Sequence, residues 1–306
     1  MPELPEVQTT VDGINKYVRG LSVRDVWTGY KSAYHTGKDN IKDPKYFKFF
    51  KKEIIGKKIE KASRRAKNVL IHLSDRETIL IHMKMTGHIL YGKYKRVESG
   101  EWIVDSKKEN DPLKDPFNKF IRLAFTLSNG KHLVLSDMRR FAKITFIKND
   151  GKEISRHLAN LGPEPLEKNF TFKLFQERIL KRQNGKIKIV LMDQSLIAGI
   201  GNIYSDEILW RAGVHPETRV SNISKDKLIL IFKAIKDTLK KGIDFGGDSM
   251  SDYRNILGER GKFQEKHEAY RRTGLPCRKK GCGGKIIRKI VGQRSAHFCS
   301  THQKLI

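Results

Sequence analysis

The sequence has few acidic residues for its basic content, and it has few cysteines. Its 306 residues include 34 Asp and Glu against 62 Lys and Arg, a formal net charge of +28. Three cysteines, all after residue 276, exclude the disulfide framework of a small secreted domain. No stretch approaches the roughly 20 apolar residues of a membrane span, and the N-terminus lacks the basic and hydrophobic regions of a secretory signal. We therefore expect an intracellular, cytoplasmic protein without a membrane partner.

The composition is nevertheless that of a folded protein. Apolar residues make up 38% and aromatic residues 9%, which excludes a disordered polycation. The length fits about two domains. Because an excess of positive charge attracts polyanions, and because no amphipathic anchor accompanies it, nucleic acid is favoured over a membrane surface as the partner. The basic residues gather in clusters within residues 64–67, 139–143, 181–188 and 271–280.

The N-terminal half is predicted to combine one helix with many strands. Apolar residues recur every three or four positions over residues 4–18, which predicts a helix that ends at Gly20. Short β-rich runs and the hairpin signal Asn129-Gly130 then predict a β-sandwich behind this helix. The polar segment 92–118, here called the insertion, is expected to be a loop. The predicted strands are Val69–Leu73, Ile79–His82, Phe120–Leu127, His132–Ser136 and Ile144–Ile147.

The composition changes near residue 150, where helical periodicity begins. The chain is therefore divided into residues 1–150, a helical region 151–264, and a cysteine-bearing tail 265–306, an α+β organisation overall. Residues 243–263 contain four glycines and are expected to form a mobile loop of functional importance. Residues 246–263 are here called the glycine-rich loop. The predicted helices of the central region are 153–160, 171–182, 202–212 and 224–241.

The tail has the ligand spacing of a structural metal site. Cys277 and Cys282 form one close pair, and Cys299 and His302 form a second. Sulfur and imidazole ligands favour zinc over magnesium or calcium, and four protein ligands leave no open position for chemistry. His297 is an alternative fourth ligand, but the Cys-x2-His spacing favours His302. We therefore expect one structural zinc ion.

The N-terminus offers an unusual nucleophile. The initiator Met is expected to be removed before Pro2, which exposes a secondary amine that can attack an electrophilic carbon and form an iminium. An α-amino group has a pKa of about 7.7–8.0, and the positive end of a helix dipole lowers it further. Glu3 lies next to this amine as a proton donor or acceptor. Taken alone, these two residues would be read as an ordinary helix start.

Six segments, in order along the chain, resemble the formamidopyrimidine-DNA glycosylase and endonuclease VIII family. They cover nearly the whole chain: PELPEV at the N-terminus, RRAKNVLIHL at 64–73, HMKMTG at 82–87 with DMRRF at 137–141, LMDQSLIAGIGNIYSDEILWRAGVHP at 191–216, and GQRSAHFC at 292–299. The resemblance implies an N-terminal catalytic domain, a helix–two-turn–helix DNA-binding domain and a C-terminal β-hairpin zinc finger. It also implies base excision repair of damaged double-stranded DNA by a glycosylase that is also an apurinic/apyrimidinic lyase.

The resemblance assigns roles to the N-terminal residues. Pro2 would attack C1′ of the damaged nucleotide and form a Schiff base, and β- and δ-elimination would follow. Glu3 would protonate the deoxyribose ring oxygen, and Lys67 would contact the flanking phosphates. Once the damaged base leaves the stack, the void would be filled by Met85, Arg140 and Phe141, which matches the general use of apolar wedges. Arg139 is a further expected DNA contact.

Further expected DNA contacts lie in the C-terminal half. Asn202, at a helix start after two glycines, would bind a phosphate, as would Lys188 upstream. Arg294, at the turn of the zinc hairpin, would hold the phosphates at the lesion. The glycine-rich loop resembles the formamidopyrimidine branch, whose loop covers an everted 8-oxoguanine.

Two alternatives remain open, and the sequence departs from the family's usual pattern at two places. The chain is expected to be a glycosylase for oxidised purines, with an endonuclease VIII-like enzyme for oxidised pyrimidines and a non-catalytic DNA-binding descendant as alternatives. The joint presence of Pro2, Glu3 and Lys67 argues against the last. The first cysteine spacing and the ligand His302 depart from the usual four-cysteine finger, and the insertion is longer than the family's usual loop. A monomer is expected, because no apolar association surface is evident.

Overall fold

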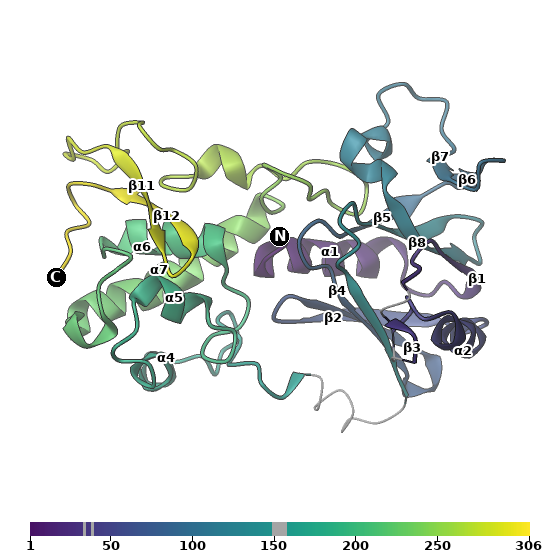
Figure 1. Cartoon of the computed structure of the whole chain (residues 1–306), viewed down its shortest axis with the longest axis horizontal. Helices are drawn as coiled ribbons and strands as arrows, with labels where there is room; N and C mark the ends of the chain where they lie inside the picture. Colours follow the sequence, from purple (N-terminus) through teal and green to yellow (C-terminus); the bar gives the residue numbers. More distant parts are fainter. Residues whose placement is uncertain (33–34, 38–39, 149–157) are drawn as a thin grey trace. The chain divides into compact units, whose positions relative to one another are not determined.

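A computed structural model describes residues 1–32, 35–37, 40–148 and 158–306 (Figure 1). The chain forms two compact units. Unit 1 consists of Met1–Leu158 with Gly246–Lys262, and unit 2 consists of Ala159–Phe245 with Phe263–Ile306. The helix predicted at 153–160 lies largely outside the described residues. The mixed α+β fold that the sequence predicts is confirmed, but the structure groups residues 246–262 with the N-terminal unit and the metal-binding tail with the helical unit.

The helix α1 (Leu4–Tyr17) and two four-stranded antiparallel sheets form the centre of unit 1. The helix buries its apolar stripe completely, with Leu4, Val7 and Ile14 at 0% exposure. Residues from α1 and from both sheets form one continuous core. The first sheet has the order β1-β8-β9-β5 and the second β10-β4-β3-β2. These strands are β1 (Val23–Thr28), β2 (Ile59–Arg65), β3 (Asn68–Leu73), β4 (Thr78–His82), β5 (His88–Gly92), β8 (Ile121–Leu127), β9 (His132–Ser136) and β10 (Lys143–Ile147).

Several elements of unit 1 were not predicted from the sequence. The helix α2 (Pro44–Ile54) is capped by the Asp43 side chain, which accepts a hydrogen bond from the Tyr46 amide at 2.7 Å. The expectation of an irregular insertion is wrong in part, because it contains a small hairpin and two 3₁₀ turns. These are β6 (Tyr94–Arg96), β7 (Trp102–Val104), η3 (Pro112–Lys114) and η4 (Pro116–Lys119), and a further turn, η2, spans Ser74–Arg76.

Unit 2 contains four α-helices and a two-stranded hairpin within the described residues. Predicted helices 171–182, 202–212 and 224–241 correspond to α4 (Phe172–Leu180), α6 (Asn202–Ala212) and α7 (Lys225–Asp244), and the short α5 (Ile187–Met192) was not predicted. The strands β11 (Ile286–Val291) and β12 (Arg294–Cys299) pair antiparallel, with Val291 opposite Arg294. In Figure 1 the hairpin lies beside α6 and α5. Two 3₁₀ turns, η5 (Val220–Asn222) and η6 (Phe263–Lys266), complete the unit.

Candidate functional site

The predicted catalytic residues Pro2 and Glu3 lie at the start of α1. Pro2 is buried, and the Glu3 residue is only 2% exposed. Glu3 is the N-cap of α1 and forms a capping box with Glu6, in which each side chain accepts a hydrogen bond from the other residue's backbone. The bond from the Glu3 amide to Glu6 Oε2 is 2.7 Å long. The spacing Glu3-x-x-Glu6 therefore fixes the backbone on which Pro2 and Glu3 are carried.

Glu6 also connects this helix start to the glycine-rich loop. Its Oε1 accepts a hydrogen bond from the Asp248 amide at 2.8 Å, and its carbonyl accepts one from the Tyr253 hydroxyl at 3.0 Å. Burial raises the pKa of Tyr253, so its hydroxyl stays protonated and can donate. Sequence reasoning missed Glu6, although the glutamate three residues after the N-cap was a readable capping-box signal. The Glu6 carboxylate thus binds both the Glu3 amide, next to the predicted nucleophile in the chain, and the Asp248 amide of the loop.

Lys67 lies in the two-residue loop that joins β2 to β3. The pairing of Arg65 with Asn68 closes this loop, and Ala66 has a left-handed φ of 53°. The Asn68 side chain donates to the Arg65 carbonyl at 3.1 Å, which braces the loop. The whole Lys67 residue is 6% exposed. The sequence placed Lys67 at a strand start, and the structure places it immediately before one, in a tight hairpin rather than on a flexible surface segment.

His82 lies at the end of β4, opposite Asn68 of β3. Burial, followed by the charges of Lys84 and Lys67, lowers the pKa of His82 to about 3. The Lys84 amide donates to His82 Nδ1 at 3.0 Å, so the neutral ring carries its proton on Nε2. His82 is therefore an uncharged acceptor that helps to hold the turn after β4.

Two turns between the sheets present the residues predicted to fill a DNA void. Met85 lies between β4 and β5 and is 39% exposed, and Phe141 lies between β9 and β10 and is 47% exposed. Arg140 adopts a left-handed φ of 58°, and the Arg139 guanidinium lies 4.5 Å from the Phe141 ring centroid. Exposed large apolar side chains on tight turns are suited to insertion between bases. Sequence periodicity alone would have placed Met85 and Phe141 in a core.

A buried aspartate joins these two turns. Asp137 is 0% exposed, and its Oδ1 accepts a hydrogen bond from the Thr86 hydroxyl at 2.7 Å. Its Oδ2 accepts from the Tyr30 hydroxyl at 2.8 Å and from the Ala142 amide at 2.9 Å. Thr86 in turn accepts from the Arg139 amide at 3.0 Å. Asp137 was part of a quoted motif but received no role from the sequence; the structure makes it the link between the two exposed turns.

In unit 2, Asn202 is the first residue of α6, as predicted. Gly201 is the N-cap, and Gly199 adopts a left-handed φ of 89° in the preceding turn. The Gln194 side chain braces this turn by accepting from the Gly199 amide at 2.9 Å and donating to the Ile200 carbonyl at 2.7 Å. The result is a rigid helix N-terminus of the type that binds phosphate.

The structure gives Lys188 a different place from the one the sequence implied. Its side chain is 0% exposed, and its ammonium lies 2.5 Å from Asp206 Oδ1 and 3.1 Å from the Ser205 hydroxyl. A buried ammonium held in this way does not reach a DNA phosphate, so the predicted contact is corrected to an internal ion pair. Lys188 Nζ also donates to the Asn202 carbonyl at 3.4 Å, which supports the start of α6.

Arg294 begins β12, next to the two-residue turn of the terminal hairpin. Gly292 and Gln293 both have positive φ, 54° and 63°, as a tight hairpin turn requires. The Arg294 side chain is exposed. A Cβ at Gly292 would lie 2.6 Å from a side-chain carbon of Ile189, so glycine allows the hairpin to approach α5 closely. This packing fixes the position of Arg294 within unit 2.

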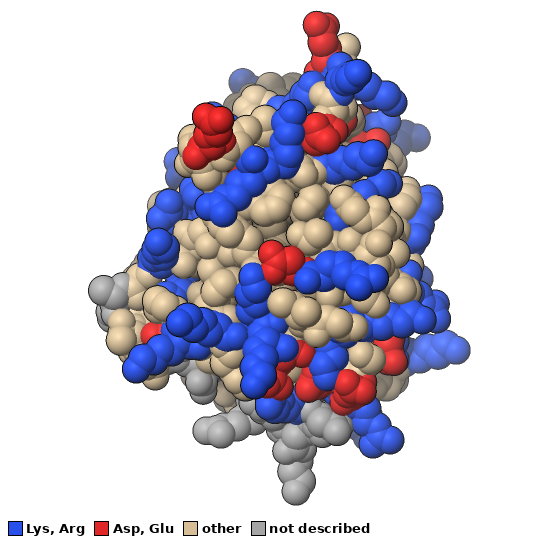
Figure 2. Space-filling model, turned by 90° about the vertical axis from the view of Figure 1, so that its right-hand side faces the viewer, with Lys and Arg blue, Asp and Glu red and all other residues tan. Residues whose placement is uncertain are grey.

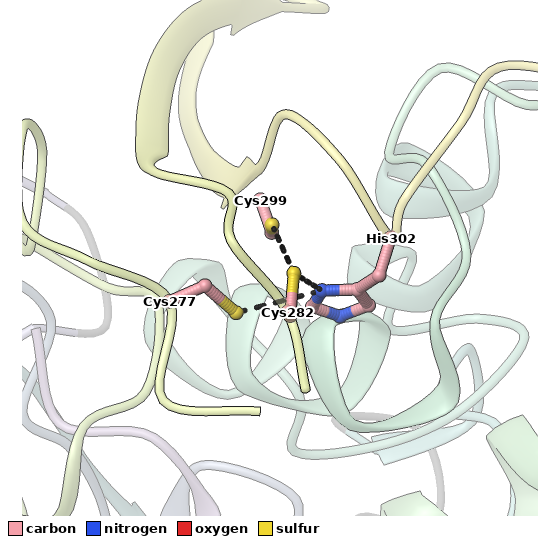
Figure 3. Close-up of side chains that lie close together, drawn as sticks. All are labelled: Cys277, Cys282, Cys299 and His302. Carbon is pink, nitrogen blue, oxygen red and sulfur yellow. Dashed lines mark hydrogen bonds between the residues drawn. The ribbon is translucent and has the colours of Figure 1, made fainter. Parts of the chain in front are cut away.

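Three cysteines and one histidine converge in unit 2 (Figure 3). In the described part of the chain, the donor atoms of Cys277, Cys282, Cys299 and His302 lie within 4.8 Å of one another, and no other such group of metal-ligating residues occurs. The sulfur atoms of Cys282 and Cys299 are 3.6 Å apart, and Cys277 Sγ lies 3.5 Å from His302 Nδ1. This spacing allows all four groups to contact one tetrahedral ion.

Hydrogen bonds to neighbouring groups indicate which histidine, and which of its nitrogens, faces the three cysteines. His302 Nε2 lies 3.1 Å from the Trp210 carbonyl, so Nε2 carries the proton and Nδ1 faces the cysteines. His297, the alternative ligand, instead donates through its amide and Nδ1 to Asp206 Oδ2 at 2.9 and 3.0 Å. The structure therefore brings His302, and not His297, together with the three cysteines. An ion held by all four groups would have no open position for chemistry.

Basic side chains also occur in large numbers outside the predicted site residues. Figure 2 shows one face on which Lys and Arg side chains surround an uncharged area and greatly exceed the acidic ones. This agrees with the formal net charge of +28. Among the described residues, no helix is both long and apolar enough to span a membrane.

Comparisons with known proteins match the whole chain. The family model described as "Formamidopyrimidine-DNA glycosylase N-terminal domain" matches residues 1–144, and "Formamidopyrimidine-DNA glycosylase H2TH domain" matches residues 161–254. A formamidopyrimidine-DNA glycosylase of Pelotomaculum thermopropionicum is 35% identical, with 100% of both chains covered. The one from Bacillus subtilis is 34% identical, with 99% of both chains covered.

Solved structures agree with these sequence matches. Lactococcus lactis Fpg in complex with abasic-site DNA has a TM-score of 0.81 and 29% identity, with 99% of both chains covered. MutM in complex with DNA containing carbocyclic 8-oxo-G has a TM-score of 0.80 and 31% identity, with 99% of this chain and 100% of that chain covered.

Proposed function

The chain belongs to the formamidopyrimidine-DNA glycosylase family, a group of base excision repair enzymes, and from this premise we propose that it removes oxidised purines and then cleaves the abasic strand. The substrates are 8-oxoguanine and formamidopyrimidines in double-stranded DNA. The observation that carries the proposal is the buried Pro2-Glu3 start of α1, which shares Glu6 with the glycine-rich loop.

The proposed chemistry begins at Pro2 after removal of Met1. The neutral amine attacks C1′ and displaces the base, which leaves with the electrons of the glycosidic bond and takes up the proton that the Pro2 nitrogen loses. Glu3 donates a proton to the ring oxygen as the C1′–O4′ bond breaks, which gives an iminium between Pro2 and the opened sugar. Loss of the proton on C2′ drives β-elimination of the 3′ phosphate, and δ-elimination of the 5′ phosphate follows. Lys67 in its braced hairpin contacts the phosphates beside the lesion.

The proposed DNA grip uses both units. Met85, Arg140 and Phe141 fill the space that the everted nucleotide leaves, and Arg140 pairs with the orphaned base while Arg139 stacks on Phe141. Asn202 and Arg294 bind backbone phosphates from unit 2. Such contacts supply affinity rather than sequence preference, as a repair enzyme requires.

We assign zinc to the group of three cysteines and His302, because borderline-soft zinc prefers thiolate and imidazole ligands in a tetrahedron. Bound zinc supplies no step of the reaction. It fixes the β11–β12 hairpin, and therefore Arg294, within unit 2.

The substrate assignment is tested with matched duplexes. Excision rates are measured on 8-oxoguanine opposite cytosine, thymine glycol opposite adenine, and an undamaged control. We expect preferential excision of 8-oxoguanine. Faster excision of thymine glycol would favour an endonuclease VIII-like enzyme, and binding without excision on any duplex would favour a non-catalytic descendant.

A further inference from the structure

The insertion packs against the glycine-rich loop through a buried arginine. Arg254 in the loop is 2% exposed, and its Nε lies 2.9 Å from Asp115 Oδ2 in the insertion. Its guanidinium carbon lies 5.0 Å from the centroid of the Phe117 ring. The Arg254 side chain also donates to the Ser251 and Tyr253 carbonyls at 2.9 and 2.8 Å. One buried cation therefore connects an insertion turn to the loop's own backbone.

A second contact lies one turn further along the insertion. The Asn118 side-chain amide donates to the Pro112 carbonyl at 2.9 Å and to the Gly258 carbonyl at 3.4 Å. Its oxygen lies 2.9 Å from Nε2 of the buried His88. Gly258 has a φ of 85°, and a Cβ there would lie 2.7 Å from the Pro112 backbone. The insertion and the loop thus touch along their backbones, with no space for a side chain between them.

A third contact anchors the loop in unit 1 itself. The Tyr91 amide, at the end of β5, donates to the Ile256 carbonyl at 2.6 Å, and the Ile256 side chain belongs to the main core. Residues 253–258 therefore contact the rest of unit 1 at three places: at Asp115, at Asn118 and at Tyr91. The remaining part of the loop reaches the helix start, where the Asp248 amide donates to Glu6.

We propose that the insertion is a device for positioning the glycine-rich loop, with Asp115 and Arg254 as its positioning residues, and that it thereby promotes removal of the damaged base. This inference rests on the proposed function, in which the loop covers the everted base. If residues 253–258 were displaced, Asp248 would move away from Glu6. The loop would then no longer cover the everted nucleobase correctly. Strand cleavage at a preformed abasic site has no base to cover, so it depends less on this contact.

The test compares two activities of the same protein. Asp115→Asn removes the charge that faces Arg254 but keeps the side-chain oxygen that accepts from the Phe117 amide at 2.9 Å. Arg254→Met removes the cation of the same ion pair and leaves Asp115 unchanged. The control is Asp105→Asn, which breaks a more exposed ion pair of the same insertion, 3.4 Å from Lys95. For each, the excision rate on an 8-oxoguanine duplex is divided by the cleavage rate on a preformed abasic duplex.

We expect this ratio to fall at least about fivefold for both pair variants, equivalent to about 1 kcal/mol of transition-state stabilisation, and to stay unchanged for Asp105→Asn. Equal loss of both activities, together with a lower melting temperature, would show a merely structural role and overturn the proposal. An unchanged ratio in both pair variants would overturn it as well. A wild-type protein inactive on both duplexes would instead remove the proposed function.

A measurement on the wild-type protein makes the test independent of variant folding. Hydrogen exchange should show the amides of Asn255, Leu257 and Gly258, which donate hydrogen bonds within the loop, protected to the level of the unit 1 strands, since the buried contacts prevent the loop from opening. Exchange as fast as in exposed turns of unit 1 would contradict the proposed anchoring.

Discussion

At the scale of single residues, Phe141 offers the clearest separation of function from stability. Its ring is 47% exposed, so Phe141→Ala should change the free energy of unfolding by less than about 1 kcal/mol. Loss of a stacking ring should weaken binding to a duplex with an abasic-site analogue about tenfold, because base–aromatic stacking is worth about 1–3 kcal/mol. Fluorescence titration checks this, with Phe49→Ala, 38% exposed on α2, as the control. Equal weakening by both substitutions would argue against insertion of Phe141.

The lowered pKa of His82 predicts that acid reduces the free energy of unfolding of unit 1. The folded-state pKa of this residue is lowered to about 3, below the ordinary value near 6.5. The unfolded chain therefore binds a proton more readily, and the stabilisation from neutral His82 is lost progressively as pH falls from about 6.5 toward 3. Urea unfolding between pH 7 and pH 4 should show a smaller decline in His82→Gln than in the wild type. The same decline in both would show that His82 does not titrate as described.

The sequence could predict candidate site residues but not their surroundings. The cysteines are readable because their spacing is specific, whereas Pro2 and Glu3 stand out only through the resemblance to the glycosylase family. The contact of Glu6 with Asp248 and the role of Asp137 were missed, because they depend on residues more than 50 positions away in the chain. The place of Lys188 was misread because its pairing with Asp206, 18 residues further along the chain, depends on how two helices pack inside unit 2.

At the scale of elements, the Lys188–Asp206 pair should govern the stability of unit 2. Lys188→Met leaves Asp206 buried without its ammonium, which costs about 3–5 kcal/mol of unfolding free energy. Lys186→Met is the matched control, because Lys186 pairs with Glu217 at 2.6 Å and its side chain is 47% exposed. That change should cost less than about 1 kcal/mol. Guanidinium unfolding measures both, and equal costs would contradict the burial-based account of Lys188.

The metal group predicts a local loss of order in the terminal hairpin. Chelation should release one zinc ion per chain and destabilise β11 and β12, because four ligands close the site and metal binding contributes to folding. Elemental analysis and hydrogen exchange of residues 277–302 measure the two effects. Active protein with no bound metal would refute the assignment, and full protection after chelation would refute the structural role.

The elements that were predicted correctly are those with a strong local signal. Helix α1 has an unbroken apolar stripe, and β8 and β9 flank an Asn-Gly turn. The helix α2 was missed because, within its lysine-rich sequence, only Phe50 and Ile54 are buried. The β6–β7 hairpin was missed because its strands have only three residues each. Short or highly charged elements depend on tertiary packing, which sequence periodicity does not report.

At the scale of the whole molecule, the charge of +28 predicts salt-sensitive DNA binding. An interface with about 6–10 phosphate contacts loses about 10³–10⁵ in affinity between 50 and 200 mM salt. We expect at least about a hundredfold loss, with similar slopes for damaged and undamaged duplexes, because backbone contacts are shared. Binding titrations over this range check it, and a slope near zero would exclude phosphate contacts as the main source of affinity.

The predicted DNA contacts of the whole molecule are distributed over the two units. The glycine-rich loop enters unit 1 from a distant part of the sequence, and composition alone could not assign it there. Each unit otherwise contains its own predicted contacts, so one chain holds the complete proposed set. We expect a monomer, which sedimentation velocity at micromolar concentration tests.

The proposed chemistry depends most on the secondary amine of Pro2, whose nitrogen forms the bond to the sugar. Borohydride reduction during reaction with an 8-oxoguanine duplex, followed by peptide mapping, identifies the attached residue. We predict an adduct on a chain that begins at Pro2, and none from Pro2→Gly or from an N-terminally blocked protein under the same conditions. Full activity in a protein that retains Met1, or an adduct on a lysine with Pro2 unmodified, would contradict the proposed bond-breaking chemistry.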